Sequence, residues 1–167
     1  MENKRKKLWC LSYKNFSNIA FDNRWDENVP QNIAIISIIN SKDCNCGEKH
    51  ICKNSNNVLN LEFDDVSPVN YKTDAQAESY QIDEGKIVRF FHLKLAKKTY
   101  DFIQKNKGKD FYIHCSAGLS RSQAIVRFIK DTIRDINWET NPNNPCLFPN
   151  GFVYQQLMKI YRNEYYV

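Results

Sequence analysis

The apolar run at positions 33–39 constrains the fold of this chain more than any other stretch of its sequence. It reads IAIISII, so apolar and mostly β-branched side chains fill nearly every position rather than every second one. A strand with this pattern has both of its faces buried, which is typical of a parallel sheet with helices on both sides. We therefore expect 33–39 to be a central strand of an α/β fold.

Segments with the periodicity of strands and of helices alternate along the rest of the chain. This interleaving predicts a mostly parallel central sheet flanked by helices. A chain of 167 residues is long enough to bury a substantial hydrophobic core and has the length of one domain. We therefore expect a single domain over 1–167. The expected strands are 7–12, 33–39, 58–63 and 110–114, the expected helices are 15–20, 90–105, 124–136 and 151–163, and the expected loops are 40–57, 66–89 and 137–150.

The segment 114–122, HCSAGLSRS, carries the strongest chemical signal. It joins the expected strand 110–114 to a helix, so it lies at the carboxyl end of a strand, where α/β sheets bind ligands. The inward N–H groups of such a loop and the N-terminus of the next helix form a cradle for an anion of phosphate size. Cys115 lies at the base of this cradle. These surroundings lower a thiol pKa to roughly 3.5–7.5 and so favour the nucleophilic thiolate.

The neighbours of Cys115 suit phosphate chemistry. Arg121 has a planar guanidinium that can hold two phosphoryl oxygens at once, which a lysine cannot do. Gly118 permits a loop conformation that a β-carbon would obstruct. Ser122 can donate its hydroxyl to the sulfur of Cys115 and help it to leave in a second step. We expect His114 to orient the loop through backbone hydrogen bonds rather than to act as a base.

The pattern His-Cys-x5-Arg-Ser resembles the signature loop of the cysteine-dependent protein tyrosine phosphatases. In its small size the chain is most similar to members of the compact dual-specificity branch, including its bacterial and viral relatives. The resemblance covers about 31–162 in the order of elements and is sharp at 114–122. It implies a dual-specificity phosphatase fold, a phosphocysteine intermediate and no cofactor. The loop residues that would contact the substrate are Ser116, Ala117, Gly118, Leu119, Ser120 and Arg121.

The resemblance also implies an aspartate on the loop that follows strand 58–63. This residue would protonate the leaving oxygen and then activate water for the second step. Two aspartates end the strand, and we expect the acid to be Asp65, with Asp64 as the first alternative. The insertion at 66–89 is longer than in a minimal member of the family, and it contains Asp83 and Asp74 as further alternatives. This insertion is expected to act as a lid or a substrate-recognition loop.

A cluster of cysteine and histidine residues at 44–52 is the second notable feature. Cys44, Cys46, His50 and Cys52 are the ligand types of a structural zinc site. The Cys-x-Cys and His-x-Cys spacings are shorter than those of known zinc motifs, so we favour a flexible or redox-sensitive loop over a metal site.

The composition of the chain limits which binding partners and which cellular location we expect. The formal net charge of +5 agrees with anionic ligands but is too small to indicate nucleic acid binding. No apolar run reaches the roughly 18 residues of a membrane span, and the charged N-terminal stretch does not resemble a secretory signal. Six cysteines in such a chain do not suggest a disulfide framework. We therefore expect a cytoplasmic monomer without a membrane partner.

The expected activity is hydrolysis of phosphotyrosine in proteins, with phosphoserine and phosphothreonine as further substrates. A phosphorylated protein or peptide would be the partner, and phosphate or another oxyanion would occupy the loop. Within the same chemistry, the alternatives are RNA 5′ ends and phosphoinositides. A non-catalytic phospho-binding module, and an arsenate reductase or sulfurtransferase, are the alternatives from other classes.

Overall fold

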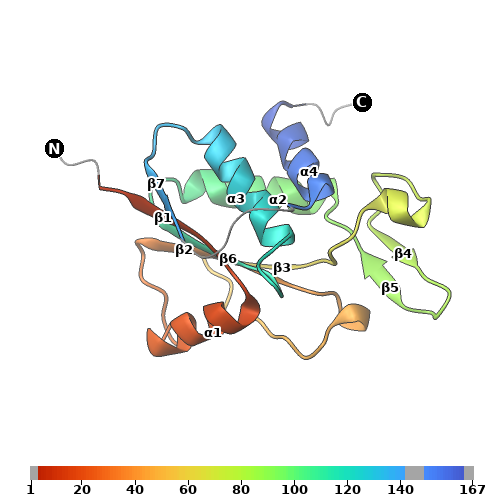
Figure 1. Cartoon of the computed structure of the whole chain (residues 1–167), viewed down its shortest axis with the longest axis horizontal. Coiled ribbons are helices and arrows are strands. Elements are labelled where there is room, and N and C mark those ends of the chain that lie inside the picture. The colour runs from red at the N-terminus through yellow and green to blue at the C-terminus, as the bar shows by residue number, and fades with distance from the viewer. Residues whose placement is uncertain (1–3, 142–148, 164–167) are drawn as a thin grey trace.

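A sheet of five strands lies at the centre of the computed structural model, which describes residues 4–141 and 149–163 (Figure 1). The strands are β1 (Lys6–Leu11), β2 (Ile33–Ile39), β3 (Val58–Glu62), β6 (Asp110–His114) and β7 (Trp138–Thr140). Their order in space is β3-β2-β6-β1-β7, and each of the four pairings is parallel. The α/β class and the mostly parallel sheet predicted from the sequence are thus confirmed.

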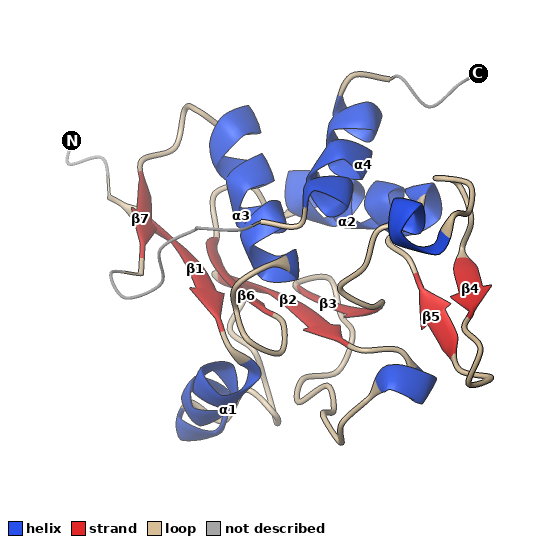
Figure 2. Cartoon of the chain, turned by 45° about the vertical axis from the view of Figure 1, so that its right-hand side comes forward, coloured by secondary structure: helices blue, strands red, loops and turns tan. Residues whose placement is uncertain are grey.

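Helices cover both faces of the sheet (Figures 1 and 2). α2 (Leu93–Lys105), α3 (Arg121–Thr132) and α4 (Gly151–Tyr161) lie together on one face, and α1 (Tyr13–Asp22) lies on the other. The helices that were expected to flank the sheet are therefore present. Within the described residues, no helix has both the length and the apolar character needed to cross a membrane.

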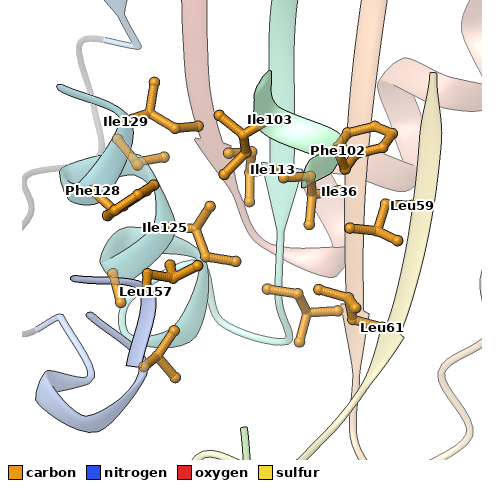
Figure 3. Close-up of a cluster of buried hydrophobic side chains, with 14 of the residues drawn as sticks. Ile36, Leu59, Leu61, Phe102, Ile103, Ile113, Ile125, Phe128, Ile129 and Leu157 are labelled. Carbon is orange, nitrogen blue, oxygen red and sulfur yellow. The ribbon is translucent and has the colours of Figure 1, made fainter. Parts of the chain in front are cut away.

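β2 has both of its faces buried, as the apolar run predicts. Ala34, Ile36 and Ile38 belong to the large cluster beneath α2, α3 and α4, whereas Ile35 packs with Phe16 of α1 in a smaller cluster. The period of two along a strand sends neighbouring side chains to opposite faces, and here each face has its own core. Figure 3 shows strand residues Ile36, Leu59, Leu61 and Ile113 near Phe102, Ile103, Ile125, Phe128, Ile129 and Leu157 of the helices.

α3 differs most from its expected extent. It begins at Arg121, one turn before the expected start at Ala124, and it ends at Thr132. The first turn carries the polar residues Ser122 and Gln123, which are buried even though they are polar, so the apolar periodicity starts late. The other expected strands and helices begin and end within three residues of their predicted positions.

The expected loops contain elements that the sequence did not indicate. The insertion at 66–89 holds a 3-10 turn at Pro68–Tyr71 and an antiparallel hairpin of β4 (Ser79–Gln81) and β5 (Ile87–Arg89). β7 lies in the expected loop 137–150, of which 142–148 fall outside the described residues. These strands are three residues long and mostly exposed, so they carry no alternation of apolar and polar residues.

Candidate active site

Cys115 directly follows the central strand β6, and α3 begins six residues later at Arg121. The order strand, loop, helix predicted for this segment is confirmed. The Cys115 side chain is 2% exposed, and it lines a cavity at the carboxyl ends of the strands. A loop between a parallel strand and a helix N-terminus is a common anion site because its N–H groups and the helix dipole act together.

The carbonyl groups of this loop are held by donors that lie outside it. The carbonyl of Cys115 accepts from Nδ1 of His114 (3.3 Å), that of Ser116 from the backbone N–H of Tyr13 (3.0 Å), and that of Gly118 from Nε2 of Gln123 (3.1 Å). A trans peptide holds its C=O and N–H on opposite sides. The N–H groups that follow these carbonyls are therefore directed away from those outside donors, which is the arrangement that an oxyanion cradle requires.

Gly118 occupies a position in the loop that leaves no room for a side chain. Its φ is +72°, and a β-carbon built there would lie 2.7 Å from the backbone carbon of Leu11 and 2.7 Å from the backbone nitrogen of Ser12. The loop thus touches the end of β1 through this glycine. The sequence-based expectation that a β-carbon would obstruct the loop is confirmed.

The sulfur of Cys115 lies 3.0 Å from Oγ of Ser122, as the expected role of this serine requires. Ser122 is fully buried, and its hydroxyl also lies 3.0 Å from the sulfur of Cys10 on β1. The serine hydroxyl has one proton, which it donates to Cys115 when that residue is a thiolate. The serine oxygen can then accept from the Cys10 thiol, whose sulfur also lies 3.5 Å from the carbonyl of Gly118. Cys10 lies in a short apolar stretch of the sequence, and nothing there distinguishes it from a core residue.

Arg121 is 4% exposed and is held from three directions. Its Nη1 donates to Oδ1 of Asn40 (2.7 Å) and to the carbonyl of Phe63 (2.7 Å), and its Nη2 donates to Oγ of Ser116 (3.2 Å). Nε is buried and has no hydrogen-bond partner among the described residues. An unpaired buried donor is costly, and an oxyanion in the adjoining cavity would satisfy it. Sequence analysis missed Asn40, a single polar residue in a long loop with no distinguishing spacing.

The two aspartates after β3 have different surroundings. Asp65 is exposed, and its Oδ1 accepts from Oγ of Ser120 (2.7 Å) and from Nδ2 of Asn150 (2.8 Å). Within the described residues Oδ2 makes no hydrogen bond, which leaves an oxygen that can carry the proton. The carboxylate lines the same cavity as Cys115, as an acid catalyst requires.

Asp64 is 4% exposed, and backbone and hydroxyl donors occupy both of its oxygens. It accepts from the N–H of Ser41 (2.9 Å), the hydroxyl of Ser41 (2.6 Å) and the N–H of Arg89 at the end of β5 (2.8 Å). A carboxylate with this many structural donors has no free oxygen for a proton that must be transferred. The geometry therefore favours Asp65 over Asp64.

The cavity has a volume of about 670 Å³ and is shared by the loop and the insertion. Of the loop residues expected to contact a substrate, all but Gly118 line it. The alternative acids Asp74 and Asp83 do not line it. The opposite wall belongs to the insertion and consists of Val66, Tyr71, Ile82, Glu84, Lys86 and Val88.

His114 is fully buried and stacks on Phe16, with ring centroids 4.4 Å apart. Burial lowers the pKa of its imidazole to about 4, so the ring is neutral near neutral pH. Its Nδ1 lies 3.3 Å from the carbonyl of Cys115 and must donate there, since a carbonyl can only accept. The expected role of His114, to orient the loop through the backbone, agrees with this contact.

The cysteine and histidine cluster does not form a metal site. Across 4–141 and 149–163, no group of three or more His, Cys, Asp or Glu side chains could hold a metal ion. Cys52 is buried in the core beside α1, where burial raises its thiol pKa to about 11, whereas Cys46 is exposed. His50 bonds instead to Oγ of Ser37 at 2.7 Å, and Cys44 lies beside the cavity. The four side chains of the zinc alternative are therefore not grouped around a common point in the described part of the chain.

In comparisons with known proteins, no protein-family model, no curated protein and no solved structure matched this chain. What the site can do is therefore inferred from its residues and their geometry.

Proposed function

We propose that this chain is a cysteine-dependent phosphatase with a fold of the dual-specificity type, and that it hydrolyses phosphotyrosine in protein substrates. A compact catalytic unit of this kind also accepts phosphoserine and phosphothreonine, and it works in the cytoplasm. One observation carries the proposal: a buried thiol, a buried guanidinium and an exposed carboxylate line the same cavity. These groups belong to Cys115, Arg121 and Asp65.

The loop binds the phosphoryl group. Its N–H groups and Arg121 offer several donors to the three equatorial oxygens, on which charge accumulates in the transition state. Nη1 and Nη2 of Arg121 already have protein partners at 2.7 and 3.2 Å, so the side chain is in place before substrate arrives. Such pre-organisation supports catalysis because little reorganisation remains to be made during the reaction.

The reaction takes place in two steps. In the first, the Cys115 thiolate attacks phosphorus, the P–S bond forms as the ester P–O bond breaks, and Asp65 gives its proton to the leaving oxygen. In the second, the Asp65 carboxylate takes a proton from water, which attacks phosphorus and breaks the P–S bond. Inorganic phosphate leaves, and the hydroxyl of Ser122, 3.0 Å from the sulfur, stabilises the departing thiolate.

The wall of the cavity supports an aryl phosphate as the substrate. Tyr71, Ile82 and Val88 of the insertion and Leu119 of the loop offer apolar surface above the polar base. A volume of about 670 Å³ lies within the range of small-molecule sites and accommodates a phosphotyrosine side chain with part of its backbone.

The test compares wild type, Cys115→Ser, Asp65→Asn and, as a matched control, Asp83→Asn, which is exposed and outside the cavity. Hydrolysis of a phosphotyrosine peptide is measured across pH with a chelator and a reductant present. We expect Cys115→Ser to abolish turnover, Asp65→Asn to lower kcat by about 10²- to 10⁴-fold, and the control to match wild type. With p-nitrophenyl phosphate the Asp65→Asn loss should be smaller, because that leaving group needs little protonation.

Full activity of Cys115→Ser would contradict the covalent mechanism. A wild type that binds the phosphopeptide without turnover would favour a phospho-binding module instead. Equal losses in Asp65→Asn and Asp83→Asn would mean that the acid is not Asp65.

A further inference from the structure

A chain of three polar side chains lies behind the cysteine loop and is not used in the reaction steps above. Ser37 of β2 is 1% exposed and lies beside the fully buried His114 in the register of β2 and β6. Oγ of Ser37 is 2.7 Å from Nε2 of His114 and 2.7 Å from Nδ1 of His50, which comes from the loop between β2 and β3. The chain therefore links a partly exposed imidazole to the residue that holds the Cys115 carbonyl.

The hydrogen bond between His114 and the Cys115 carbonyl determines the direction of the two hydrogen bonds that Ser37 makes with His114 and His50. Nδ1 of His114 must donate to the carbonyl of Cys115, and a neutral imidazole has only one N–H, so Nε2 must accept. The Ser37 hydroxyl is then the donor to Nε2, and its oxygen accepts from His50, whose Nδ1 must carry a proton. Each proton in the chain thus points toward Cys115.

The neutral state of both imidazoles agrees with this direction. Burial lowers the pKa of His50 and lowers that of His114 to about 4, and near His50 it outweighs the opposing effect of the Glu62 carboxylate. The proximity of His50 and the positive charge of Arg121 contribute to the lowered pKa of His114 in the same direction as burial. Neither imidazole is therefore expected to be protonated near neutral pH.

The hydrogen bonds from His50 through Ser37 to His114 fix the orientation of the peptide that joins Cys115 to Ser116. Because this peptide is planar, a carbonyl held toward His114 directs the N–H of Ser116 to the opposite side. The same loop that supplies His50 also reaches the cradle through Glu48, whose Oε2 accepts from Oγ of Ser116 at 2.9 Å. The segment around His50 thus supports the cradle at two neighbouring points.

We propose that His50 and Ser37 are positioning residues, which hold the Cys115–Ser116 peptide in the orientation that stabilises the thiolate and the bound oxyanion. The catalytic part of this inference rests on the proposed phosphatase function. The effect of His50 and Ser37 on the Cys115 thiol does not depend on that function, because the acidity of Cys115 can be measured without any turnover.

The test uses His50→Ala and Ser37→Ala to interrupt the chain, and His50→Asn to retain it. An asparagine places its amide nitrogen where histidine has Nδ1, so it keeps the donor to Ser37. Cys46→Ala is the matched control, since Cys46 is an exposed residue of the same loop. The probe is iodoacetamide: its rate of reaction with Cys115, followed by mass spectrometry across pH, gives the thiol pKa, and kcat and KM are measured alongside.

We expect each alanine variant to raise the Cys115 thiol pKa by about half to one unit and to lower kcat/KM by about 3- to 10-fold, the size expected for one hydrogen bond. His50→Asn should restore both values, and Cys46→Ala should leave them unchanged. If Ser37→Ala does not fold, the two His50 variants alone decide the question, because His50 is only half-buried.

A wild-type thiol pKa in folded His50→Ala would overturn the proposal, even if the variant were less stable, because a purely structural contact would move stability alone. Normal turnover with an unchanged thiol pKa would refute the positioning role and leave the phosphatase intact. A shifted thiol pKa in a protein without turnover would support the positioning role and contradict the phosphatase.

Discussion

Ser122 lies where it would stabilise the thiolate that leaves in the second step of the proposed reaction. Its hydroxyl lies between two sulfur atoms, 3.0 Å from Cys10 and 3.0 Å from Cys115. The Cys10 thiol can supply a hydrogen bond to the serine oxygen, which leaves the serine proton for Cys115. In the proposed reaction, Cys10 would thereby orient the hydroxyl that stabilises the leaving thiolate, although the sequence shows it only as part of an apolar stretch.

The Ser122→Ala variant tests this role. Removing a hydrogen bond to a charged sulfur should lower kcat by about 10- to 100-fold, and phosphocysteine should accumulate because its hydrolysis becomes slower than its formation. Rapid mixing with p-nitrophenyl phosphate should then show a burst of product equal to the enzyme concentration. Ser17→Ala, which removes a hydroxyl bonded to the Tyr13 carbonyl on α1, is the control. A kcat loss without a burst would place the defect in the first step.

The cysteine loop and the end of β1 come so close at Gly118 that no side chain fits between them. A β-carbon at Gly118 would meet the backbone of Leu11 and Ser12 at 2.7 Å, and Leu11 cannot withdraw without losing its pairing with His114 in the sheet. The position of the loop is therefore tied to the position of β1.

Gly118→Ala should for this reason destabilise the protein by about 2–4 kcal/mol, through strain at positive φ and overlap with the backbone. The matched control is Gly85→Ala, where φ is +78° but a β-carbon would have nothing within 4 Å. That change should cost about 1–2 kcal/mol from the backbone conformation alone. Urea unfolding of both variants measures the difference, and equal losses would show that the contact with β1 does not matter.

The elements that could be predicted from the sequence are those with a long periodic pattern. β2 and the strand, loop and helix around Cys115 were predicted because burial and loop chemistry leave a local pattern in the sequence. The β4–β5 hairpin left none, since its strands are short and exposed. Asn40 and Ser37 were missed for another reason: they reach Arg121 and His114 only after the sheet has formed, and no spacing in the chain records such contacts.

Stability of the whole molecule should depend on pH through the buried imidazole at its centre. His114 has a folded-state pKa of about 4 against an ordinary 6.5, so between these values the unfolded chain binds a proton that the folded protein excludes. The free energy of unfolding should therefore fall as pH decreases, by about 2 kcal/mol between about pH 7 and about pH 5 from this residue. The lowered pKa of His50 acts in the same direction.

Urea unfolding at the two pH values measures this loss, and NMR of the imidazole in the folded wild type identifies its source. The His114 ring should stay neutral at about pH 5. Protonation of this ring near its ordinary pKa would contradict the expectation, whatever the unfolding curves showed.

The hydrogen bonds of Asp64 have a consequence for how this molecule could acquire new substrates. They tie the end of β5 to Ser41, and Asp43 accepts from the N–H of Ile87, so β5 is anchored at both its first and its last residue. The turn between the two hairpin strands, which places Ile82, Glu84 and Lys86 at the cavity, lies beyond these anchors. In the proposed phosphatase, substrate recognition and bond cleavage would thus be carried by separate stretches of the chain. On that proposal, exchange of the turn at 82–86 would change which phosphorylated sequence is preferred and would leave Cys115, Arg121 and Asp65 unchanged.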